Sequence, residues 1–188
     1  MRRFAAASIV LLFIICIFTA CDTQEEPLSP AIAFRAQLAQ FGCTFHADVT
    51  TDLGETAVQF AMDCAVDAEG AVRLTVTEPE RIAGITATVA ADTGKLTYDG
   101  MALDFGLLAN GNVVPAAAPA IAADCWLRQY IASAGHEDER YHVTYERDFD
   151  EKCLFVDTWF ENAVPICAEV CYNGQRILKI LITEFQSQ

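Results

Sequence analysis

The sequence is poor in the residues that catalytic and phosphate-binding sites need. After residue 20 the serines are Ser29, Ser133 and Ser187, and none lies in the glycine-flanked turn that exposes a nucleophilic serine. The chain has three histidines and no glycine-rich phosphate-binding loop. We therefore expect a protein that is not an enzyme and needs no cofactor.

Basic residues are also scarce. The chain has 12 Lys and Arg against 26 Asp and Glu, which gives a formal net charge of −14 at pH 7. Such an acidic protein repels the phosphate backbones of DNA and RNA, which excludes a nucleic-acid partner. It also repels an anionic lipid surface. Attachment to a membrane therefore has to come from a lipid and not from a basic patch.

A long apolar run occurs only at the N-terminus. Arg2 and Arg3 precede the stretch Phe4–Ala20, and Cys21 follows it directly. Basic residues, an apolar core and small residues before the end are typical of a secretory signal. An uncleaved anchor helix is the alternative, although a stretch of 17 residues only reaches the lower limit for spanning a bilayer. Both interpretations place the rest of the chain outside the cytoplasm, held at the cell membrane.

Three regions follow from this pattern. Residues 1–20 are the predicted signal, and residues 21–30 are a polar tether with two prolines. Residues 31–188 have the size of one ordinary domain, large enough to be stable without disulfides or metals.

Cysteine usage leaves two states open. Besides Cys16 and Cys21 there are six cysteines, an even number that permits up to three disulfides in an exported domain. Each of the six lies in an apolar, regularly patterned segment, which favours buried free thiols instead. The six are Cys43, Cys64, Cys125, Cys153, Cys167 and Cys171.

Periodicity predicts two helices and about ten strands. The helical segments are Pro30–Phe41 and Pro115–Ala134. In the second segment we expect the helix to begin at Pro119, because a proline in its interior would kink it. Alternating segments with turn residues between them indicate an antiparallel meander. The strand segments are 43–50, 56–66, 71–77, 84–90, 95–98, 101–107, 137–147, 153–161, 164–172 and 175–185, with Asn173-Gly174 as a hairpin turn.

The C-terminal strand is apolar on both faces. Leu178, Ile180 and Ile182 share one face, and Ile177, Leu181 and Phe185 share the other. A strand of this kind is usually covered on both sides, so we expect the helices to cover it.

Several segments carry a family resemblance. The order of one helix, about six strands, a second helix and four strands resembles the LolA/LolB-like fold. A resemblance to lipoproteins of clostridial type extends over nearly all of residues 31–186. The segments that carry it are Val76–Pro79, Ala83–Thr86, Leu96–Gly100, Asp104–Gly106, Pro115–Pro119, Thr158–Phe160 and Ala168–Tyr172. The resemblance implies an α+β fold, in which a strongly curved antiparallel sheet forms an unclosed half-barrel with two covering helices.

The end of the signal resembles the lipobox of bacterial lipoproteins. It consists of Phe18-Thr19-Ala20-Cys21, with Phe18 in place of the usual Leu, Val or Ile. In that family the cysteine thiol receives a diacylglyceryl group and becomes the N-terminus. The resemblance therefore implies lipidation of Cys21, which would be the contact with the membrane.

Two functions remain open. In the first, the concave face binds a lipid or another amphiphile, and the segment 115–134 acts as a lid. The aromatic residues that would line this cavity are Phe34, Phe45, Phe60, Tyr98, Phe105, Trp126 and Trp159, unless they simply fill a core. In the second, the protein is an envelope scaffold or regulator that binds another protein, as the related germination lipoproteins do.

One short motif has the residue types of a metal site. Cys167, Glu169 and Cys171 alternate, so they share one face of a strand. Their spacing lacks the usual gap of zinc sites, and we predict no metal here. We expect Glu169 to pair with Lys179 on the neighbouring strand instead.

Overall fold

A single curved sheet forms most of the molecule. The computed structural model describes residues 28–52, 57–90, 93–98, 100–106, 108–109, 112–147 and 154–188. Eleven antiparallel strands follow one another in space as β6-β5-β4-β3-β2-β1-β13-β12-β11-β10-β9. They are β1 Cys43–Asp52, β2 Ala57–Val66, β3 Val72–Glu78, β4 Thr86–Ala90, β5 Thr93–Tyr98, β6 Met101–Gly106, β9 Tyr130–Glu137, β10 Arg140–Arg147, β11 Leu154–Glu161, β12 Val164–Tyr172 and β13 Gln175–Ser187.

The remaining elements are short. Strands β7 Leu108–Ala109 and β8 Asn112–Val113 pair with each other in a separate ribbon. The α-helices are α2 Ser29–Phe41 and α3 Ala118–Arg128, and single 3-10 turns cover Glu80–Ile82 and Pro115–Ala117. None of these described helices is long and apolar enough to cross a membrane.

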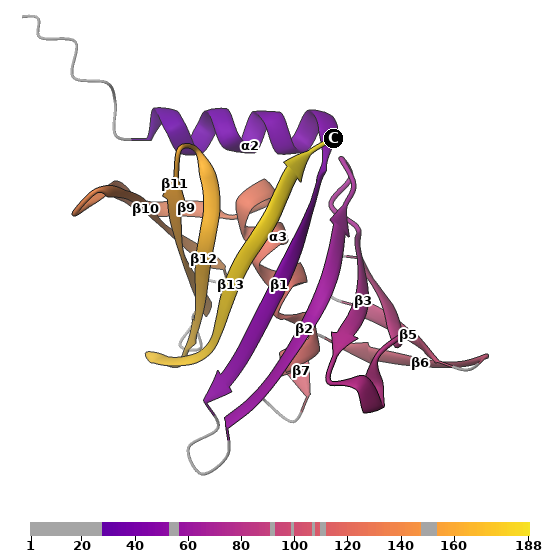
Figure 1. The fold of residues 1–188 in the computed structure, drawn as a ribbon. Helices are drawn as coiled ribbons and strands as arrows, with labels where there is room; N and C mark the ends of the chain where they lie inside the picture. Colours follow the sequence, from indigo (N-terminus) through magenta and orange to yellow (C-terminus); the bar gives the residue numbers. More distant parts are fainter. Residues whose placement is uncertain are drawn as a thin grey trace, which may run out of the picture.

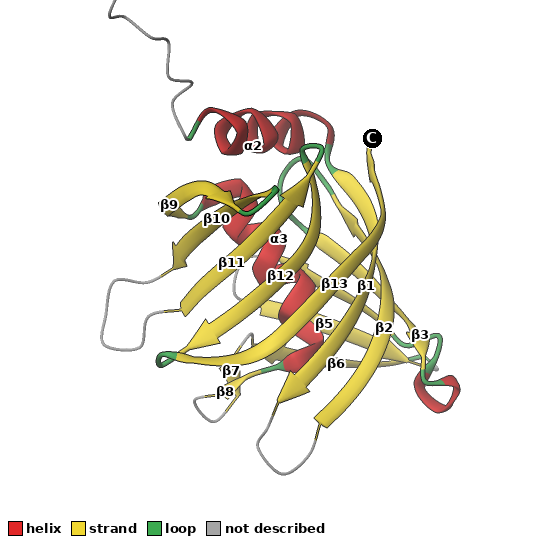
Figure 2. Ribbon diagram, turned by 60° about the vertical axis from the view of Figure 1, so that its left-hand side comes forward, coloured by secondary structure: helices red, strands yellow, loops and turns green. Residues whose placement is uncertain are grey.

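The sheet is bent into an unclosed half-barrel. Helix α3 lies inside the curve, and α2 lies across one end of the strands (Figures 1 and 2). Strands β6 and β9 are the two edges of the sheet and do not pair with each other. This architecture confirms the predicted fold class, with one strand more than the ten expected.

The second helix is shorter than predicted. Helix α3 ends at Arg128, and Gln129 is already extended (φ −80°, ψ 164°). Residues 130–134, which the sequence assigned to the helix, begin strand β9 instead. Ile131 pairs with Tyr145 of β10 and packs against the core, so tertiary packing overrides the helical pattern here. A turn at Asp138 (φ 56°) then separates two strands where one was expected.

The helices cover only one face of β13. Leu178, Ile180 and Ile182 are buried beneath them, whereas Leu181 on the convex face is 47% exposed, so the expectation of two covered faces was wrong. Phe185 was assigned to the convex face as well. An irregularity in the β1–β13 pairing, with Glu184 at φ 53°, turns Phe185 back to the concave side.

Helix α2 binds the sheet through a narrow stripe. Ala31, Phe34 and Leu38 are buried, at the spacing that places side chains on one helix face. Ile32 and Phe41 lie outside this stripe and are 54% and 48% exposed. The helix ends at Gly42 (φ 72°), whose N–H donates to the Leu38 carbonyl at 2.8 Å. A side chain on Gly42 would meet the Val66 carbonyl, so both conformation and space require glycine.

Arg35 of α2 caps the end of α3. The last carbonyls of a helix have no partners within it. The guanidinium of Arg35 donates to the carbonyls of Trp126 at 2.8 Å, Gln129 at 2.6 Å and Cys125 at 3.4 Å. Its positive charge also suits the negative end of the α3 dipole. One side chain of the N-terminal helix thereby satisfies the buried end of a helix some 90 residues away.

Replacement of Arg35 by Met should therefore destabilise the fold. We expect the free energy of unfolding to fall by about 2–3 kcal/mol, because partly buried carbonyls lose charge-assisted hydrogen bonds. Urea unfolding followed by circular dichroism measures the change. The control is Arg81→Met in the exposed 3-10 turn, which should alter stability by no more than about 0.5 kcal/mol. Equal effects of the two substitutions would show that the cap contributes nothing.

Candidate functional site

Three of the seven predicted cavity-lining residues come together, and they form a packed core. The Trp126 ring lies 5.8 Å from both Phe34 and Phe45, measured between ring centroids. Phe34 also contacts Phe160 (5.0 Å) and Phe185 (6.0 Å). These edge-on and tilted contacts are the favourable arrangements of aromatic rings. The rings therefore fill the space beneath α2 with one another.

The other four predicted residues are dispersed. Phe60 and Phe105 are partly buried at the margin of the core. Tyr98 is 44% exposed. Trp159 alternates along β11 with the buried Thr158 and Phe160, so it lies on the convex face and cannot line the concave one. There it stacks on His142 (4.7 Å) and its Nε1 donates to Glu137 at 2.7 Å.

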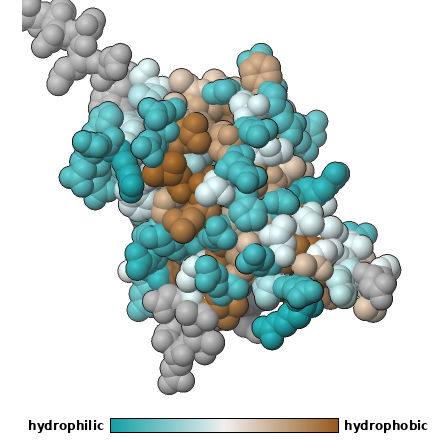
Figure 3. Space-filling model, in the orientation of Figure 1, coloured by the Kyte–Doolittle hydropathy of each residue, from teal (hydrophilic) through white to brown (hydrophobic). Residues whose placement is uncertain are grey.

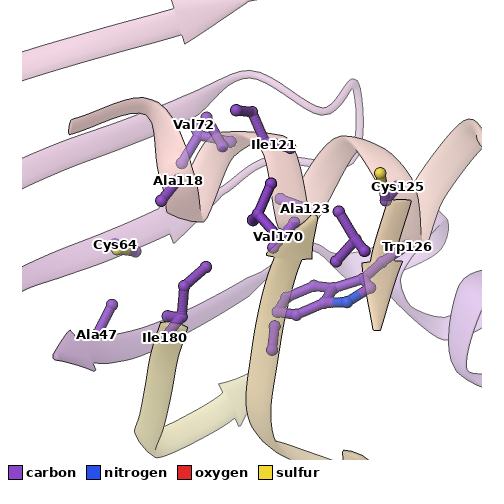
Figure 4. Close-up of a cluster of buried hydrophobic side chains, with 14 of the residues drawn as sticks. Ala47, Cys64, Val72, Ala118, Ile121, Ala123, Cys125, Trp126, Val170 and Ile180 are labelled. Carbon is purple, nitrogen blue, oxygen red and sulfur yellow. The ribbon is translucent and has the colours of Figure 1, made fainter. Parts of the chain in front are cut away.

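Helix α3 fills the middle of the half-barrel. Every residue from Ala118 to Trp126 is buried, and the side chains of Ile121 and Trp126 extend from the helix into the core (Figure 4). The indole Nε1 of Trp126 donates to Thr158 Oγ1 at 3.0 Å, so this buried polar pair is satisfied. The expectation that this segment is a loosely packed lid was wrong. Its small side chains let the helix backbone approach the strands.

The buried end of α3 also carries a charged cluster. Asp124, 8% exposed, accepts hydrogen bonds from Arg128 at 3.1 Å and from the Gln129 side chain at 2.8 Å. Arg147 of β10 lies 3.6 Å from the same carboxylate. A buried carboxylate with two arginine partners is the arrangement expected of a structural ion pair. We therefore assign this cluster to the fold and not to catalysis.

Two apolar hollows remain beneath α2. One, of about 230 Å³, is lined by Leu38, Val164 and Phe185 among others. The second, of about 210 Å³, is lined by Tyr141, Phe160 and His136 among others. Both include Phe34 and the turn Asn162-Ala163, so they flank the same part of the helix. Neither reaches the roughly 300 Å³ at which small-molecule sites usually begin.

The concave face is open at its other end. Here β5 and β6 form what we call the β5–β6 wing (residues 93–98 and 101–106). Met101 is 70% exposed and Leu103 is 65% exposed, and they pair with Tyr98 and Leu96 across the strands. Leu96 packs against the core, which places all four side chains on the concave side. β6 is an edge strand, so its outer backbone groups have no partner strand in the described sheet.

Sequence reasoning did not identify Met101 and Leu103. The alternation Met-Ala-Leu-Asp-Phe predicted a strand with an apolar face, and that strand is present. Nothing in the local pattern distinguishes an edge strand from a central one. The usual signal for an edge is charge on the strand, and β6 carries only Asp104.

The convex face carries histidine–carboxylate pairs. His142 Nε2 lies 3.0 Å from Asp157 Oδ1, which also accepts from Thr144 at 2.7 Å. His46 Nδ1 lies 2.8 Å from Asp63 Oδ1. Both residues line a hollow of about 320 Å³. The thiol of Cys64 belongs to the same lining, but burial raises its pKa, so it is a poor nucleophile. These pairs are consistent with a polar sheet surface.

The motif at Cys167–Cys171 is structural. Glu169 accepts from Arg176 at 3.1 Å and lies 3.8 Å from Lys179, which confirms the predicted pair. Among the described residues, no group of three or more His, Cys, Asp or Glu is arranged to hold a metal. Apolar side chains gather on this convex face of the molecule (Figure 3). They include the exposed Leu181 and the half-buried Cys167, which pair across β12 and β13.

Five cysteines in the described part of the chain are free thiols: Cys43, Cys64, Cys125, Cys167 and Cys171. Cys21 and Cys153 lie outside the described residues. Burial raises the pKa of the Cys43 thiol to about 12, and it also raises the pKa values of the half-buried Cys167 and Cys171. The thiols of Cys43, Cys167 and Cys171 are therefore protonated at neutral pH.

No family model and no curated protein matches the chain. Solved structures with similar topology include a putative outer membrane lipoprotein-sorting protein domain from Vibrio parahaemolyticus (9% identity, 86% of this chain and 92% of that chain, TM-score 0.49). Another is a chain in the structure of the CwlD amidase from Clostridioides difficile in complex with the GerS lipoprotein (11%, 89% and 99%, TM-score 0.45). A third is a LolA superfamily protein from Nitrosomonas europaea (9%, 84% and 93%, TM-score 0.44). At such identities and TM-scores they transfer no function to this chain.

Alkylation should distinguish the thiols by burial. With iodoacetamide at pH 8 and no reductant, we expect Cys43, Cys64 and Cys125 to stay unmodified in the native protein. Cys167 and Cys171 should react slowly, because their thiolate fraction is low. In denaturant all five should react, as read by peptide mass spectrometry. A cysteine that stays unmodified in denaturant until reductant is added would reveal a disulfide.

Proposed function

We propose that this chain is a non-enzymatic lipoprotein, tethered outside the cytoplasm through Cys21, that binds another protein at the β5–β6 wing. The observation that carries the proposal is the distribution of apolar surface. The concave face is occupied in its middle by α3, while the wing exposes Met101 and Leu103 on a strand whose outer edge has no partner strand in the described sheet. Soluble proteins seldom leave such an edge with so little charge, here only Asp104, unless something covers it.

The geometry of the wing favours an extended partner segment. A strand added beside β6 would bond to its free backbone groups, and alternate side chains would rest on Met101 and Leu103. Removal of each of these side chains from water contributes about 1.5–3 kcal/mol. A second copy of this chain would bring the same net charge of −14 to the contact. We therefore expect the partner segment to be apolar on one face and basic around it.

A second candidate function is binding of an amphiphile beneath α2. The two hollows there are lined by Phe34, Phe160 and Phe185, and His136 and Glu139 provide polar groups in one of them. Each hollow fits part of an acyl chain only, so α2 would have to shift. Native mass spectrometry of the protein purified from its host tests this: recovery without bound lipid counts against it.

The anchor is tested by Cys21→Ala. We expect the variant to appear in the soluble fraction or to be mislocalised, because the acidic domain has no attraction of its own for an anionic membrane. Fractionation of cells followed by immunoblotting measures the distribution. Wild-type protein is the control for expression. If the signal is cleaved and the Cys21→Ala variant still sediments with membranes, lipidation of Cys21 is not the attachment.

Photo-crosslinking at Leu103 tests the wing. With benzophenone-alanine at position 103, irradiated host cells should give an adduct heavier than the monomer, and sequencing of the adduct should reveal an extended segment with Lys or Arg. A further Met101→Asp substitution should reduce the adduct at least tenfold, because it places a charge on the apolar face.

The control carries the same crosslinker at Thr88, an exposed residue on the convex side of β4. It should give no adduct. An adduct at both positions, or at neither, argues against a binding site on the wing. An adduct of twice the monomer mass would identify a second copy of this chain as the occupant and would contradict the proposed basic partner.

A further inference from the structure

The outward face of α2 carries no charge in an acidic molecule. The helix contains one charged residue, Arg35, and its guanidinium is turned inward onto the carbonyls of α3. The exposed residues of α2 are Ser, Pro, Ile, Ala, Gln and Phe, without a carboxylate among them. Ile32 and Phe41 are about half exposed.

Helix α2 is also the first folded element after the tether. Seven peptide steps separate Cys21 from Leu28, so even a fully extended tether spans no more than about 24 Å. In Figure 1, α2 lies across the end of the half-barrel and forms the outermost layer of the described chain there. The start of α2 is therefore the part of the folded domain nearest to Cys21 along the chain, and the outward face of the helix begins there.

We propose that the exposed face of α2 rests on the bilayer surface, with Ile32 entering the interfacial region. This inference rests on the proposed lipidation of Cys21. The occupant is a lipid surface, because the tether holds this face within reach of one. The acidic remainder of the surface is repelled by anionic lipids, whereas the face of α2 is not. The acyl chains provide the affinity, and the helix face sets the orientation.

In this orientation one molecule can contact the membrane through α2 and a partner protein through the β5–β6 wing. The β5–β6 wing lies at the far side of the sheet from α2 (Figure 1). With α2 on the membrane, the wing lies away from the lipid and stays accessible to a partner.

Tryptophan quenching in vesicles tests the inference. Lipidated full-length protein carrying Ile32→Trp is reconstituted into phosphatidylcholine vesicles with brominated acyl chains. After subtraction of the wild-type signal from Trp126 and Trp159, we expect the new tryptophan to be quenched several-fold more than in Leu181→Trp, whose reporter lies on the convex sheet face. An added Ala36→Glu should remove most of this difference, whereas Thr88→Glu should preserve it.

The outcomes separate this inference from the anchoring proposal. Vesicle flotation reports attachment independently of quenching. If the protein floats and the reporters at positions 32 and 181 are quenched equally, the docking of α2 is overturned and the anchor stands. If the full-length protein purified from host membranes does not float at all, both are overturned.

Discussion

The fold depends on how the backbone carbonyls at the C-terminal end of α3 find hydrogen-bond donors. The last carbonyls of α3 are partly shielded from water, and α3 has no capping glycine of its own. The guanidinium of Arg35 supplies those hydrogen bonds from α2. Because that end is satisfied, the helix can be buried from Ala118 to Trp126 and fill the half-barrel. The middle of the concave face is thereby filled, while Met101 and Leu103 stay exposed at its rim.

Much of this fold could be predicted, because strand alternation is a local property. Cys43, Phe45, Ala47 and Val49 alternate with polar residues, and they are buried as the pattern predicts. The position of a strand within the sheet is not local. Whether Trp159 faces α3 or solvent depends on the side toward which the sheet curves. The exposure of Met101 depends on the position of β6, which has no neighbour on its outer side in the described sheet. Such facts arise from contacts between residues far apart in sequence.

The errors in the sequence-based prediction have a common cause. The segment after Arg128 is compatible with a helix, but Ile131 gains burial beside Tyr145 only as a strand. Phe185 leaves the alternation of β13 because the irregularity at Glu184 lets it join Phe34 and Phe45. In both cases the burial of a large side chain outweighed the local period.

The position of β13 has a consequence for assembly of the sheet. This most C-terminal strand lies in the centre, where it alone joins β1 to β12. Without β13 the strands would form two separate blocks, one from β1 to β6 and one from β9 to β12. A ribosome-bound chain can therefore build both blocks but cannot unite them until residues 175–187 are free. Such long-range closure slows folding.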